Sequence, residues 1–472
     1  MMIPRHRAVV IGGSMAGLFA ARVLADHFEQ VTILDRDELT ESAEFRNGVP
    51  QSRHLHQLLL RGQQIMEQLF PTLPADLKAI GAPSLEWGYN AIVATSEGFT
   101  YPAHTGLRSN TVSRIALEAL IRRRIRELPN VTFLSRHTAT GLLTTPDLTT
   151  VTGVRAEKRG TREPLDVPAD LVVDAGGRQS QAPDWLVALG YERPTRTMVD
   201  AHVGYASCWF EKPAWMPPDV AIMLVKAHPQ THRSGMILEV EGGRWTVILT
   251  GNNRDYPPSD IEGFLEYARS LQSPLVYNYI RHARPLTQVY GYRNTNSVWN
   301  HYEKLDRRPE GFIVTGDAAC GFNPVYGQGM SVAAMDAELL GRLLREWSSG
   351  PSTGFAGEFQ KRLADAVRVP FALATADDLR QPTVEGDVPQ QSWFLKQMGI
   401  YFRALIDVTD VDPVVFAQFV RVMNLLDAPT TLLRPNMIWR VARYTLSGRR
   451  PLRKEAHLGI TLMPRVSEGV PD

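Results

Sequence analysis

The sequence Val9-Val10-Ile11-Gly12-Gly13-Ser14-Met15-Ala16-Gly17 decides the fold, because it places a glycine-rich turn between an apolar strand and a helix. Apolar residues 8–11 predict the strand, and small and apolar residues at helical spacing over 14–27 predict the helix. Residues 31–34 predict a second strand. Such a turn presents backbone N–H groups and the positive end of a helix dipole to a pyrophosphate. The segment therefore predicts a Rossmann-like dinucleotide site.

Two features refine this prediction. Ser14 replaces the middle glycine of the usual G-x-G-x-x-G pattern, and serine is small enough to be tolerated there. Asp35 ends the second strand, about 20 residues downstream, where a carboxylate can accept hydrogen bonds from ribose hydroxyls. The alternative is a tight strand-to-helix turn without a nucleotide, but turn, helix and acid together favour a dinucleotide. The residues expected to contact it are Gly12, Gly13, Ser14, Met15, Ala16, Gly17, Asp35 and Arg36.

Length and composition limit the wider possibilities. With 472 residues the chain exceeds the roughly 250 to 300 residues at which a single core stops growing, so two or three lobes are expected. A net charge of +1 gives no electrostatic footprint for nucleic acid. Cys208 and Cys320 are far apart and predict neither a disulfide scaffold nor a metal site. No apolar run approaches the roughly 20 residues of a membrane span, and the short segment before the first strand leaves no room for a signal peptide. We expect a cytoplasmic protein with a small-molecule partner.

Further along the chain the pattern changes twice. Between residues 201 and 295, three apolar runs follow one another without helices, and Gly242-Gly243 suits a hairpin turn, so we expect a mostly antiparallel sheet; the runs are 220–225, 236–240 and 245–249. Runs 170–173 and 311–315 end in glycine-rich turns, as parallel strands do. After Gly329 the chain is expected to be helical to Trp347 and to form a short linker over 348–354. From Phe355 onward, helices are expected to alternate with breaks at Pro382, Pro413, Pro429 and Pro435.

A second glycine-rich stretch indicates which dinucleotide is bound. It comprises Gly316-Asp317-Ala318-Ala319 and Asn323-Pro324-Val325-Tyr326-Gly327-Gln328-Gly329-Met330, before a predicted helix. It resembles the GD motif of flavoprotein monooxygenases of the para-hydroxybenzoate hydroxylase fold, although a glycine-rich loop before a core helix is an alternative. The resemblance implies that Asp317 binds the ribityl chain of FAD and that Pro324 packs beside the isoalloxazine. It also implies that the turn at Gly327, Gly329 and Met330, where a helix starts, presents backbone N–H groups to the pyrimidine edge of the flavin. A helix N-terminus at this place stabilises negative charge on reduced flavin.

The resemblance covers most of residues 1–440. It places Arg114, at a predicted helix start, near the FAD phosphates; the alternative is a solvated arginine on the helix surface. Residues 48–56, GVPQSRHLH, resemble bacterial polyketide epoxidases, including polyether-forming ones, which implies that Arg53 and His54 lie close to the flavin. An ordinary polar loop is the alternative for these residues.

We assign no catalytic residue, and Arg53, His54 and Tyr205 are the candidates for orienting groups near the ring. In a strand over 204–210, side chains alternate: Tyr205, Ser207 and Trp209 share one face, and Ala206, Cys208 and Phe210 share the other. One face is a candidate pocket wall, and a core role is the alternative. Aromatic residues of the C-terminal region are candidates for capping the substrate site, or simply helix-core residues; these are Trp393, Phe394, Tyr401 and Phe402.

One departure from the family pattern concerns the electron donor. Hydroxylases of this fold usually carry an Asp-Gly pair where this chain has Val173-Asp174-Ala175-Gly176-Gly177-Arg178, and Gly176 falls at the position of the acid. Asp174 does not simply replace it. The donor is therefore open between NAD(P)H acting directly and a partner flavin reductase. The rest of the chain shows no second dinucleotide fingerprint, which argues against flavoproteins with two Rossmann domains.

Together these patterns predict an α/β protein with a Rossmann-like FAD-binding domain, an inserted mostly antiparallel β-sheet substrate domain and a helical C-terminal region. The expected ranges are 1–75, 100–180 and 296–365 for the first, 76–99 and 181–295 for the second, and 366–472 for the third.

The resemblance implies transfer of one oxygen atom from O2, through a C4a-hydroperoxyflavin, to a small apolar secondary metabolite. Alkene epoxidation is favoured over aromatic hydroxylation. A flavin-dependent double-bond reductase and a non-enzymatic flavin-binding scaffold are the alternatives. The chain lacks the Pro-x-x-Tyr-x-Trp-x-Phe-Pro segment of such reductases and the Trp-x-Trp-x-Ile-Pro segment of flavin-dependent halogenases. Substrate identity and oligomeric state are left open by the sequence.

Overall fold

The computed structural model describes residues 6–95, 98–100, 102–216, 220–227, 232–347, 353–387 and 393–447. Its centre is a five-stranded sheet of order β19-β11-β1-β2-β7, in which all neighbouring pairs are parallel. The strands are β1 (Arg7–Ile11), β2 (Gln30–Asp35), β7 (Val131–Ser135), β11 (Leu171–Asp174) and β19 (Phe312–Val314). Because the carboxyl ends of parallel strands meet at one edge, the turns after β1, β11 and β19 lie side by side. The predicted strands around the glycine turn are confirmed.

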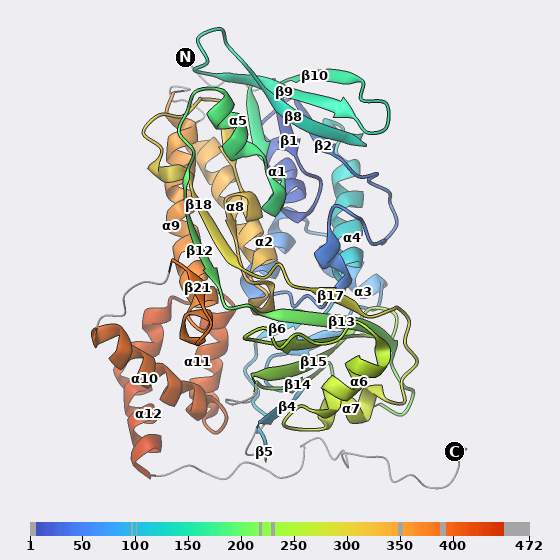
Figure 1. Cartoon of the computed structure of the whole chain (residues 1–472), viewed down its shortest axis with the longest axis vertical. Helices are drawn as coiled ribbons and strands as arrows, with labels where there is room; N and C mark the ends of the chain where they lie inside the picture. The colour runs from blue at the N-terminus through green and yellow to red at the C-terminus, as the bar shows by residue number, and fades with distance from the viewer. Residues whose placement is uncertain are drawn as a thin grey trace.

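Helices pack around this sheet and complete the upper lobe in Figure 1. They are α1 (Met15–Ala25), α2 (Leu60–Leu69), α3 (Leu73–Ala79), α4 (Arg114–Arg126), α5 (Ala182–Ala188), α8 (Gly329–Glu346) and α9 (Phe355–Thr375). Helix α8 contacts α1, α2 and α9. A three-stranded antiparallel sheet tops the lobe, with β8 (His137–Thr144), β9 (Val151–Lys158) and β10 (Pro164–Pro168). One apolar core joins these elements, so the two glycine motifs are built on a single rigid body.

The second lobe is a seven-stranded sheet of order β17-β13-β16-β15-β14-β4-β5. Its strands are β4 (Ala91–Thr95), β5 (Gly98–Phe99), β13 (Gly204–Glu211), β14 (Ile222–Val225), β15 (Arg233–Val240), β16 (Arg244–Gly251) and β17 (Tyr290–Tyr292). Only the β14–β4 pair is parallel among its described strands, so the mostly antiparallel sheet is confirmed. Gly242 and Gly243 adopt φ of +71° and +63° in the β15–β16 hairpin, as predicted.

One face of this sheet is covered by α6 (Ile261–Arg269) and α7 (Leu275–Ile280). Phe210, Trp245 and Phe264 are fully buried between them. The other face is turned toward the upper lobe, where Trp209 packs with Phe45 and Leu55. The sheet therefore presents one set of alternating side chains to its own helices and the other set to the first lobe.

Two small sheets connect the regions. One has the order β20-β18-β12-β21, with β12 (Thr195–Asp200), β18 (Ser297–His301), β20 (Cys320–Gly321) and β21 (Glu385–Gly386). The other pairs β3 (Ser84–Glu86) with β6 (Arg108–Asn110). Because β21 follows α9 and pairs with β12, the first of these sheets ties the C-terminal region to the strands that leave the upper lobe.

The C-terminal region is helical, as predicted, with α10 (Trp393–Thr409), α11 (Pro413–Met423) and α12 (Pro435–Ser447). Pro413 and Pro435 open their helices, because proline suits the first helical turn. These helices have a core of their own, including Leu405 and Val415. The expected boundary at 365/366 is wrong: α9 runs through it, and Phe371 belongs to the core of the upper lobe. A helical pattern alone does not show which body a helix packs on.

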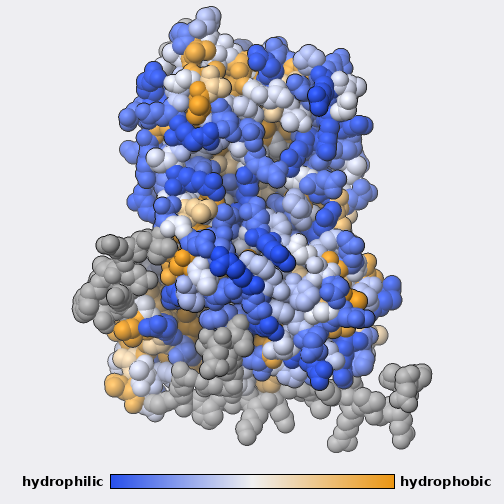
Figure 2. Space-filling view, in the orientation of Figure 1, coloured by the Kyte–Doolittle hydropathy of each residue, from blue (hydrophilic) through white to orange (hydrophobic). Residues whose placement is uncertain are grey.

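On the face shown in Figure 2, apolar patches lie over the C-terminal helices at lower left. Ile400, Ile438 and Leu446 expose 53%, 45% and 87% of their surface. Within the described ranges, no helix has the length and apolarity needed to cross a membrane. Of the expected linker over 348–354, residues 348–352 lie outside the described part, and Gly354 precedes α9.

Candidate functional site

Three strand-end turns meet at one edge of the parallel sheet. A Cβ added to Gly12, whose φ is +100°, would lie 2.5 Å from the carbonyl oxygen of Ala175 in the turn after β11. A Cβ added to Gly316, after β19, would lie 2.7 Å from the Cβ of Ala16. The N–H of Thr315 donates to the carbonyl oxygen of Asp174 over 2.9 Å. The amino-terminal glycine turn and the Gly-Asp turn are therefore in direct contact, although about 300 residues separate them.

The start of α1 has no side-chain cap. Ser14 occupies the N-cap position, but its side chain makes no cap hydrogen bond. Its hydroxyl instead donates to Glu118 Oε2 over 2.8 Å and accepts from Arg114 over 2.7 Å. A Cβ at Gly17 would overlap the carbonyl oxygen of Gly12, so this position requires glycine. The first N–H groups of α1 consequently lack a side-chain cap, which is the arrangement that binds phosphate.

A buried ionic network stands beside this turn. Glu118 accepts from Arg46, and it pairs with Arg114 and Arg122, each at 3.2 Å. Arg114 is 7% exposed, so the alternative of a solvated surface arginine is wrong. Burial alone would raise the pKa of Glu118, but the charges of Arg114 and Arg46 outweigh it and lower this pKa to about 2. The carboxylate thus stays ionised and holds the two arginines at the glycine turn.

Asp35 lies where the sequence places it, at the end of β2 beside the glycine turn. Its two oxygens accept from the N–H of Gly13 over 2.6 Å and the N–H of Asp37 over 2.8 Å. Burial raises its pKa, and the nearby Arg46 opposes the shift. Each carboxylate oxygen has a second lone pair that a ribose hydroxyl can use. Arg36 points elsewhere, donating to Gln179 over 2.9 Å at the surface.

The loop after β19 forms the opposite end of the site. Asn323 accepts from the N–H of Val325, and Gly327 adopts φ of +67°. Asp378, from the segment after α9, accepts from Tyr326 Oη over 2.7 Å and from Asn323 Nδ2 over 3.0 Å. Pro324 opens the 3-10 turn of this loop. The side chains of Met15 and Met330 face the apolar core, so only their backbone N–H groups are available to a ligand.

Some buried polar atoms at this end have no hydrogen-bond partner in the protein, and they bear on whether the site suits a flavin ring. Both amide atoms of Gln328, and Oε1 of Gln57 beside Gly327, are buried without a hydrogen bond in the described structure. Such atoms cost roughly 1 to 3 kcal/mol each unless a ligand satisfies them. Gly329 has ordinary φ and no atom nearer to an added Cβ than Asp317 Oδ1 at 3.8 Å. Glycine there leaves open space beside Asp317, so these residues fit a flat ligand edged with hydrogen-bonding groups.

The turn after β11 explains the altered Asp-Gly pair. Asp174 points inward, accepting from the N–H of Gly176 over 2.8 Å and from the hydroxyl of Ser180. Burial raises its pKa to about 6. Arg178 donates to the carbonyl oxygens of Asn296, over 2.8 Å, and Phe322, and it lies 3.9 Å from Asp317. Asp174 therefore closes its own turn, and Arg178 is the charged group that this turn extends toward the Gly-Asp loop.

The three orienting candidates come together against the second lobe. His54 Nδ1 lies 3.0 Å from Ser207 Oγ, and its ring meets that of Tyr205 edge-on at 4.7 Å between centroids. The guanidinium of Arg53 stacks over the ring of Tyr290 at 5.1 Å. The indole N–H of Trp209 donates to the carbonyl oxygen of Arg53 over 3.0 Å.

The alternation predicted along β13 is confirmed. Tyr205, Ser207 and Trp209 face the 45–57 segment, and Ala206, Cys208 and Phe210 face the helices of the second lobe. Burial lowers the pKa of His54 to about 3, so its imidazole is neutral near pH 7.

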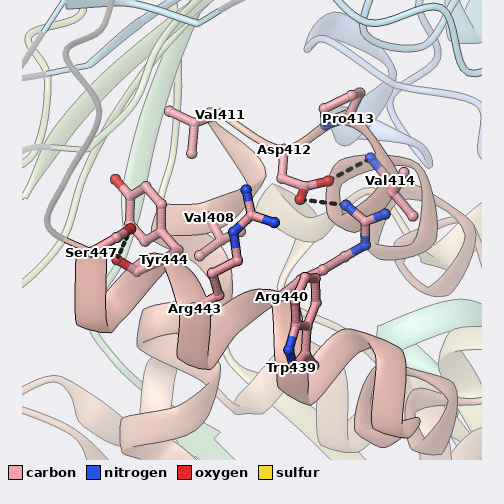
Figure 3. Close-up of a pocket in the computed structure, with 10 residues that line it drawn as sticks. All are labelled: Val408, Val411, Asp412, Pro413, Val414, Trp439, Arg440, Arg443, Tyr444 and Ser447. Atoms are coloured by element: carbon pink, nitrogen blue, oxygen red, sulfur yellow. Dashed lines mark hydrogen bonds and ion pairs between the residues drawn. The ribbon is translucent and has the colours of Figure 1, made fainter.

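The described aromatic pair of α10, Tyr401 and Phe402, lies in the core of the C-terminal helices and not in this cluster. Tyr401 donates to the carbonyl oxygen of Leu432 and packs with Phe402 in the helices' own core, so the helix-core alternative holds. The side chains of Trp393 and Phe394 lie outside the described residues. A cavity of about 270 Å³ opens between α11 and α12, where Arg440 reaches Asp412 (Figure 3). It is separate from the glycine turns.

Several groups at the site were not singled out from the sequence. Arg46, Glu118, Tyr292 and Gln328 belong to it, and Arg178 links two of its turns. Glu118 had a local signal, since it follows Arg114 by four residues on a helix, the spacing of an ion pair. Gln328 lies within the second glycine-rich stretch, between Gly327 and Gly329. Arg46, Arg178 and Tyr292 had no local signal, because their partners lie far away along the chain.

Comparisons with known proteins agree with this geometry. A family model described as an FAD binding domain matches residues 5–354. Protein Rv3254 of Mycobacterium tuberculosis is 33% identical over 439 residues, covering 90% of each chain. The structure of p-nitrophenol 4-monooxygenase PnpA from Pseudomonas putida is 16% identical, covers 90% of this chain and 99% of that one, and gives a TM-score of 0.64. That of the flavin-dependent brominase Bmp2 is 14% identical, covers 93% and 98%, and gives 0.65. At these identities the two structures show a shared fold.

Proposed function

The chain belongs to the FAD-binding-domain family, and from that premise we propose that it is a flavin-dependent monooxygenase. It transfers one oxygen atom from O2 to a small, largely apolar organic molecule, and alkene epoxidation is the favoured reaction. The observation that carries the proposal is the contact between the two glycine motifs, which builds one continuous site from the start of α1 to the start of α8. That site fits one extended dinucleotide.

The two ends of the site suit different parts of FAD. Arg46 and Arg114, held by Glu118, and the uncapped start of α1 bind the phosphates, and Asp35 accepts from the adenosine ribose. Asp317 holds the ribityl chain. Gln328 and the start of α8 bind the polar edge of the ring, which satisfies the amide that is otherwise buried without partners. When bound and reduced, FAD supplies the activation of O2.

The chain's own part in the chemistry is to position the substrate and exclude water. The face of β13 that carries Tyr205 and Trp209 forms an aromatic wall against the 45–57 segment. Its buried aromatic surface favours an apolar substrate. No general acid or base is required of the protein, which agrees with a neutral His54 at the wall.

The choice of oxygenation has support from a neighbour of the same fold, since PnpA is a p-nitrophenol 4-monooxygenase. Bmp2 is a brominase, so the fold by itself does not select the reaction. The halogenase segment Trp-x-Trp-x-Ile-Pro is missing from this sequence, which favours oxygenation. The resemblance of residues 48–56 to polyketide epoxidases favours an alkene over an aromatic ring.

The proposal is tested with the full chain reconstituted with FAD. The flavin is reduced anaerobically, by NADPH in one arm and by photoreduction in the other, and then mixed with ¹⁸O2 and two probes, styrene and 4-ethylphenol. We expect FAD to bind and ¹⁸O to appear in styrene oxide. Bleaching by NADPH identifies a direct donor, whereas product in the photoreduced arm alone identifies the need for a partner reductase.

Other results of the same assay would change or reject the proposed reaction. Ethylbenzene as the product would mean a double-bond reductase, and labelled catechol would move the proposal to aromatic hydroxylation. A protein that refuses FAD, or reduced flavin that yields only hydrogen peroxide with both probes, would overturn it. A flavin that cannot be reduced in either arm would support a scaffold.

A further inference from the structure

Helix α12 is apolar on two sides. Met437 and Val441 face the core of the C-terminal helices, which is the side that an amphipathic helix buries. Away from that core, Ile438, Ala442 and Leu446 follow one another at a spacing of four residues and form a second apolar row, the outer row. All three are exposed. A surface helix normally carries polar side chains there, so the outer row indicates an apolar partner.

The apolar surface continues beside the outer row. Trp439 is 57% exposed, and it lines the cavity between α11 and α12 together with the exposed Val414. Figure 1 places α12 at the lower left end of the molecule, outside both lobes, where apolar atoms gather in Figure 2. A helix in this position can meet an extended surface without obstruction from the two lobes. Tryptophan is also the side chain that is enriched at the boundary between lipid and water.

A basic edge borders this apolar surface. The guanidinium of Arg443 lies over the ring of Trp439, 5.2 Å from its centroid, and Arg440 pairs with Asp412 over 2.7 Å (Figure 3). Among the described residues no carboxylate pairs with Arg443. An arginine that rests on an aromatic ring at the edge of an apolar surface keeps its charge available to an anion outside the protein.

The sequence around α12 carries the same sign of charge. Residues 428–454 contain seven arginines and lysines and no aspartate or glutamate, in a chain whose net charge is only +1. Three of these, including Arg434, lie in the described part, and the other four follow Ser447 in the sequence. Positive charge next to an exposed apolar row matches the surface of a bilayer that contains anionic lipids. The same charge disfavours a second copy of this chain as the partner, because two basic edges would then approach each other.

We propose that α12 is an interfacial helix that docks this protein on an anionic phospholipid surface. The outer row and Trp439 enter the boundary between head groups and acyl chains, and Arg443 contacts a lipid phosphate. The helix lies along the bilayer surface and does not cross it. This inference concerns where the protein works and does not depend on the proposed oxygenation.

The test uses the full chain and vesicles of defined composition. Vesicles of phosphatidylcholine and phosphatidylglycerol, in a two-to-one ratio, are compared with vesicles of phosphatidylcholine alone, and co-sedimentation measures the dissociation constants. We expect at least about tenfold tighter binding to the anionic vesicles, because each basic residue near the surface adds to the attraction. Raising the salt concentration should reduce this preference.

The first variant removes the outer row. Ile438→Ser/Leu446→Ser should weaken binding to the anionic vesicles by about tenfold or more, because two apolar side chains no longer enter the bilayer. The matched control is Val187→Ser/Val369→Ser, on α5 and α9, where the two valines are 46% and 42% exposed. The control variant should bind as the unmodified protein does. All four side chains are exposed, so we expect both variants to fold, and urea unfolding measures this.

The second variant removes the charge at the basic edge. Arg443→Gln should weaken binding to the anionic vesicles about fivefold and leave binding to neutral vesicles unchanged. Arg281→Gln is the control, because Arg281 also lies over an aromatic ring, that of Tyr277, but on the second lobe. It should bind both kinds of vesicle as the unmodified protein does.

Several results would overturn the proposal. These are equal affinity for neutral and anionic vesicles, no binding to either, and unchanged binding of Ile438→Ser/Leu446→Ser. Sedimentation equilibrium without vesicles examines the alternative partner. A dimer that dissociates in the same double variant would assign the outer row to a second copy and reject the lipid surface. The vesicle assay needs no turnover, so failure of the oxygenation assay would reject the reaction and leave this inference standing.

Discussion

The two ends of the candidate cofactor site are built on opposite principles. At the phosphate end, the buried Glu118 is paired with Arg46, Arg114 and Arg122, and Ser14 joins the same network. At the ring end, the buried polar atoms of Gln328 and others have no partner. At the phosphate end the protein itself pairs the buried charges. At the ring end the buried polar atoms gain partners only when a ligand binds.

This difference separates what the site contributes to folding from what it contributes to binding. Buried charges that are paired in the protein compensate one another, so removing one of them destabilises the fold, and here they hold two arginines ready for phosphate. Buried groups without partners destabilise the fold and regain that free energy when the ligand binds. Substitutions at the phosphate end should therefore act mainly on the free energy of unfolding of the apo protein, and those at the ring end mainly on FAD affinity.

The largest expected effect belongs to the phosphate end. Glu118→Gln removes the counter-ion of three buried arginines, so the free energy of unfolding should fall by about 3 to 5 kcal/mol. Urea unfolding of the apo protein measures this. Glu127→Gln is the control at the end of the same helix, because Glu127 pairs with Arg124 but its side chain is 55% exposed. Its loss should be below about 1 kcal/mol, and similar losses in the two variants would contradict the contrast.

The next effect is a pH dependence of opposite sign at the two ends. Glu118 has its pKa lowered from 4.5 to about 2, so its contribution to stability is present above pH 4.5 and is lost as the pH falls toward 2. Asp336, which accepts from Gly316 in the Gly-Asp turn, has its pKa raised by burial from 3.8 to about 7. Its contribution is complete below pH 3.8 and is lost as the pH rises to 7.

Urea unfolding at a series of pH values separates these two contributions. Asp336→Asn should reduce the decline in stability between pH 4 and pH 7, and Glu118→Gln should reduce the loss below pH 4.5. Asp174 and Asp378 have raised pKa values of about 6, so part of the decline should remain in Asp336→Asn. A decline that is unchanged in this variant would show that Asp336 is ionised in the fold without cost.

A smaller effect should fall on FAD affinity alone. Gly329→Ala adds a methyl group in the open space beside Asp317, with no clash inside the protein. We expect about tenfold weaker FAD binding, which corresponds to about 1.4 kcal/mol, and little change in apo stability. Fluorescence titration with FAD and urea unfolding measure the two quantities. Gly316→Ala is the counterpart, because its Cβ would clash with Ala16 at positive φ and should destabilise the apo protein itself.

The smallest expected effect tests the difference between the phosphate end and the ring end most directly. Gln328→Leu removes a buried amide without partners, so the apo protein should gain about 1 kcal/mol of stability while FAD binds more weakly. Gln360→Leu is matched in chemistry and burial, but Gln360 donates to the carbonyl oxygen of Val314 over 2.7 Å. It should lose stability and keep FAD affinity. A loss of apo stability in Gln328→Leu would show that the amide has a structural role.

Much of the fold followed from local pattern. The glycine turn, the hairpin at Gly242-Gly243 and the alternation along β13 each depend on residues within one or two elements, and each is confirmed. The boundary at 365/366 was wrong because periodicity identifies a helix but not the body on which it packs. The roles assigned to Asp35, Asp317 and Arg114 stay predictions, although all three lie around the meeting glycine motifs.

The sequence by itself determined that a strand, a glycine turn and a helix would form, and that a Gly-Asp loop would precede a second helix, because steric and hydrogen-bonding demands at those positions are local. Only the tertiary structure decided that Ser14 would join Glu118 rather than cap its helix, and that Tyr205 would stack on Tyr292 beside His54. These contacts join residues far apart along the chain, and no spacing in the sequence encodes a distance that exists only after the sheets have packed.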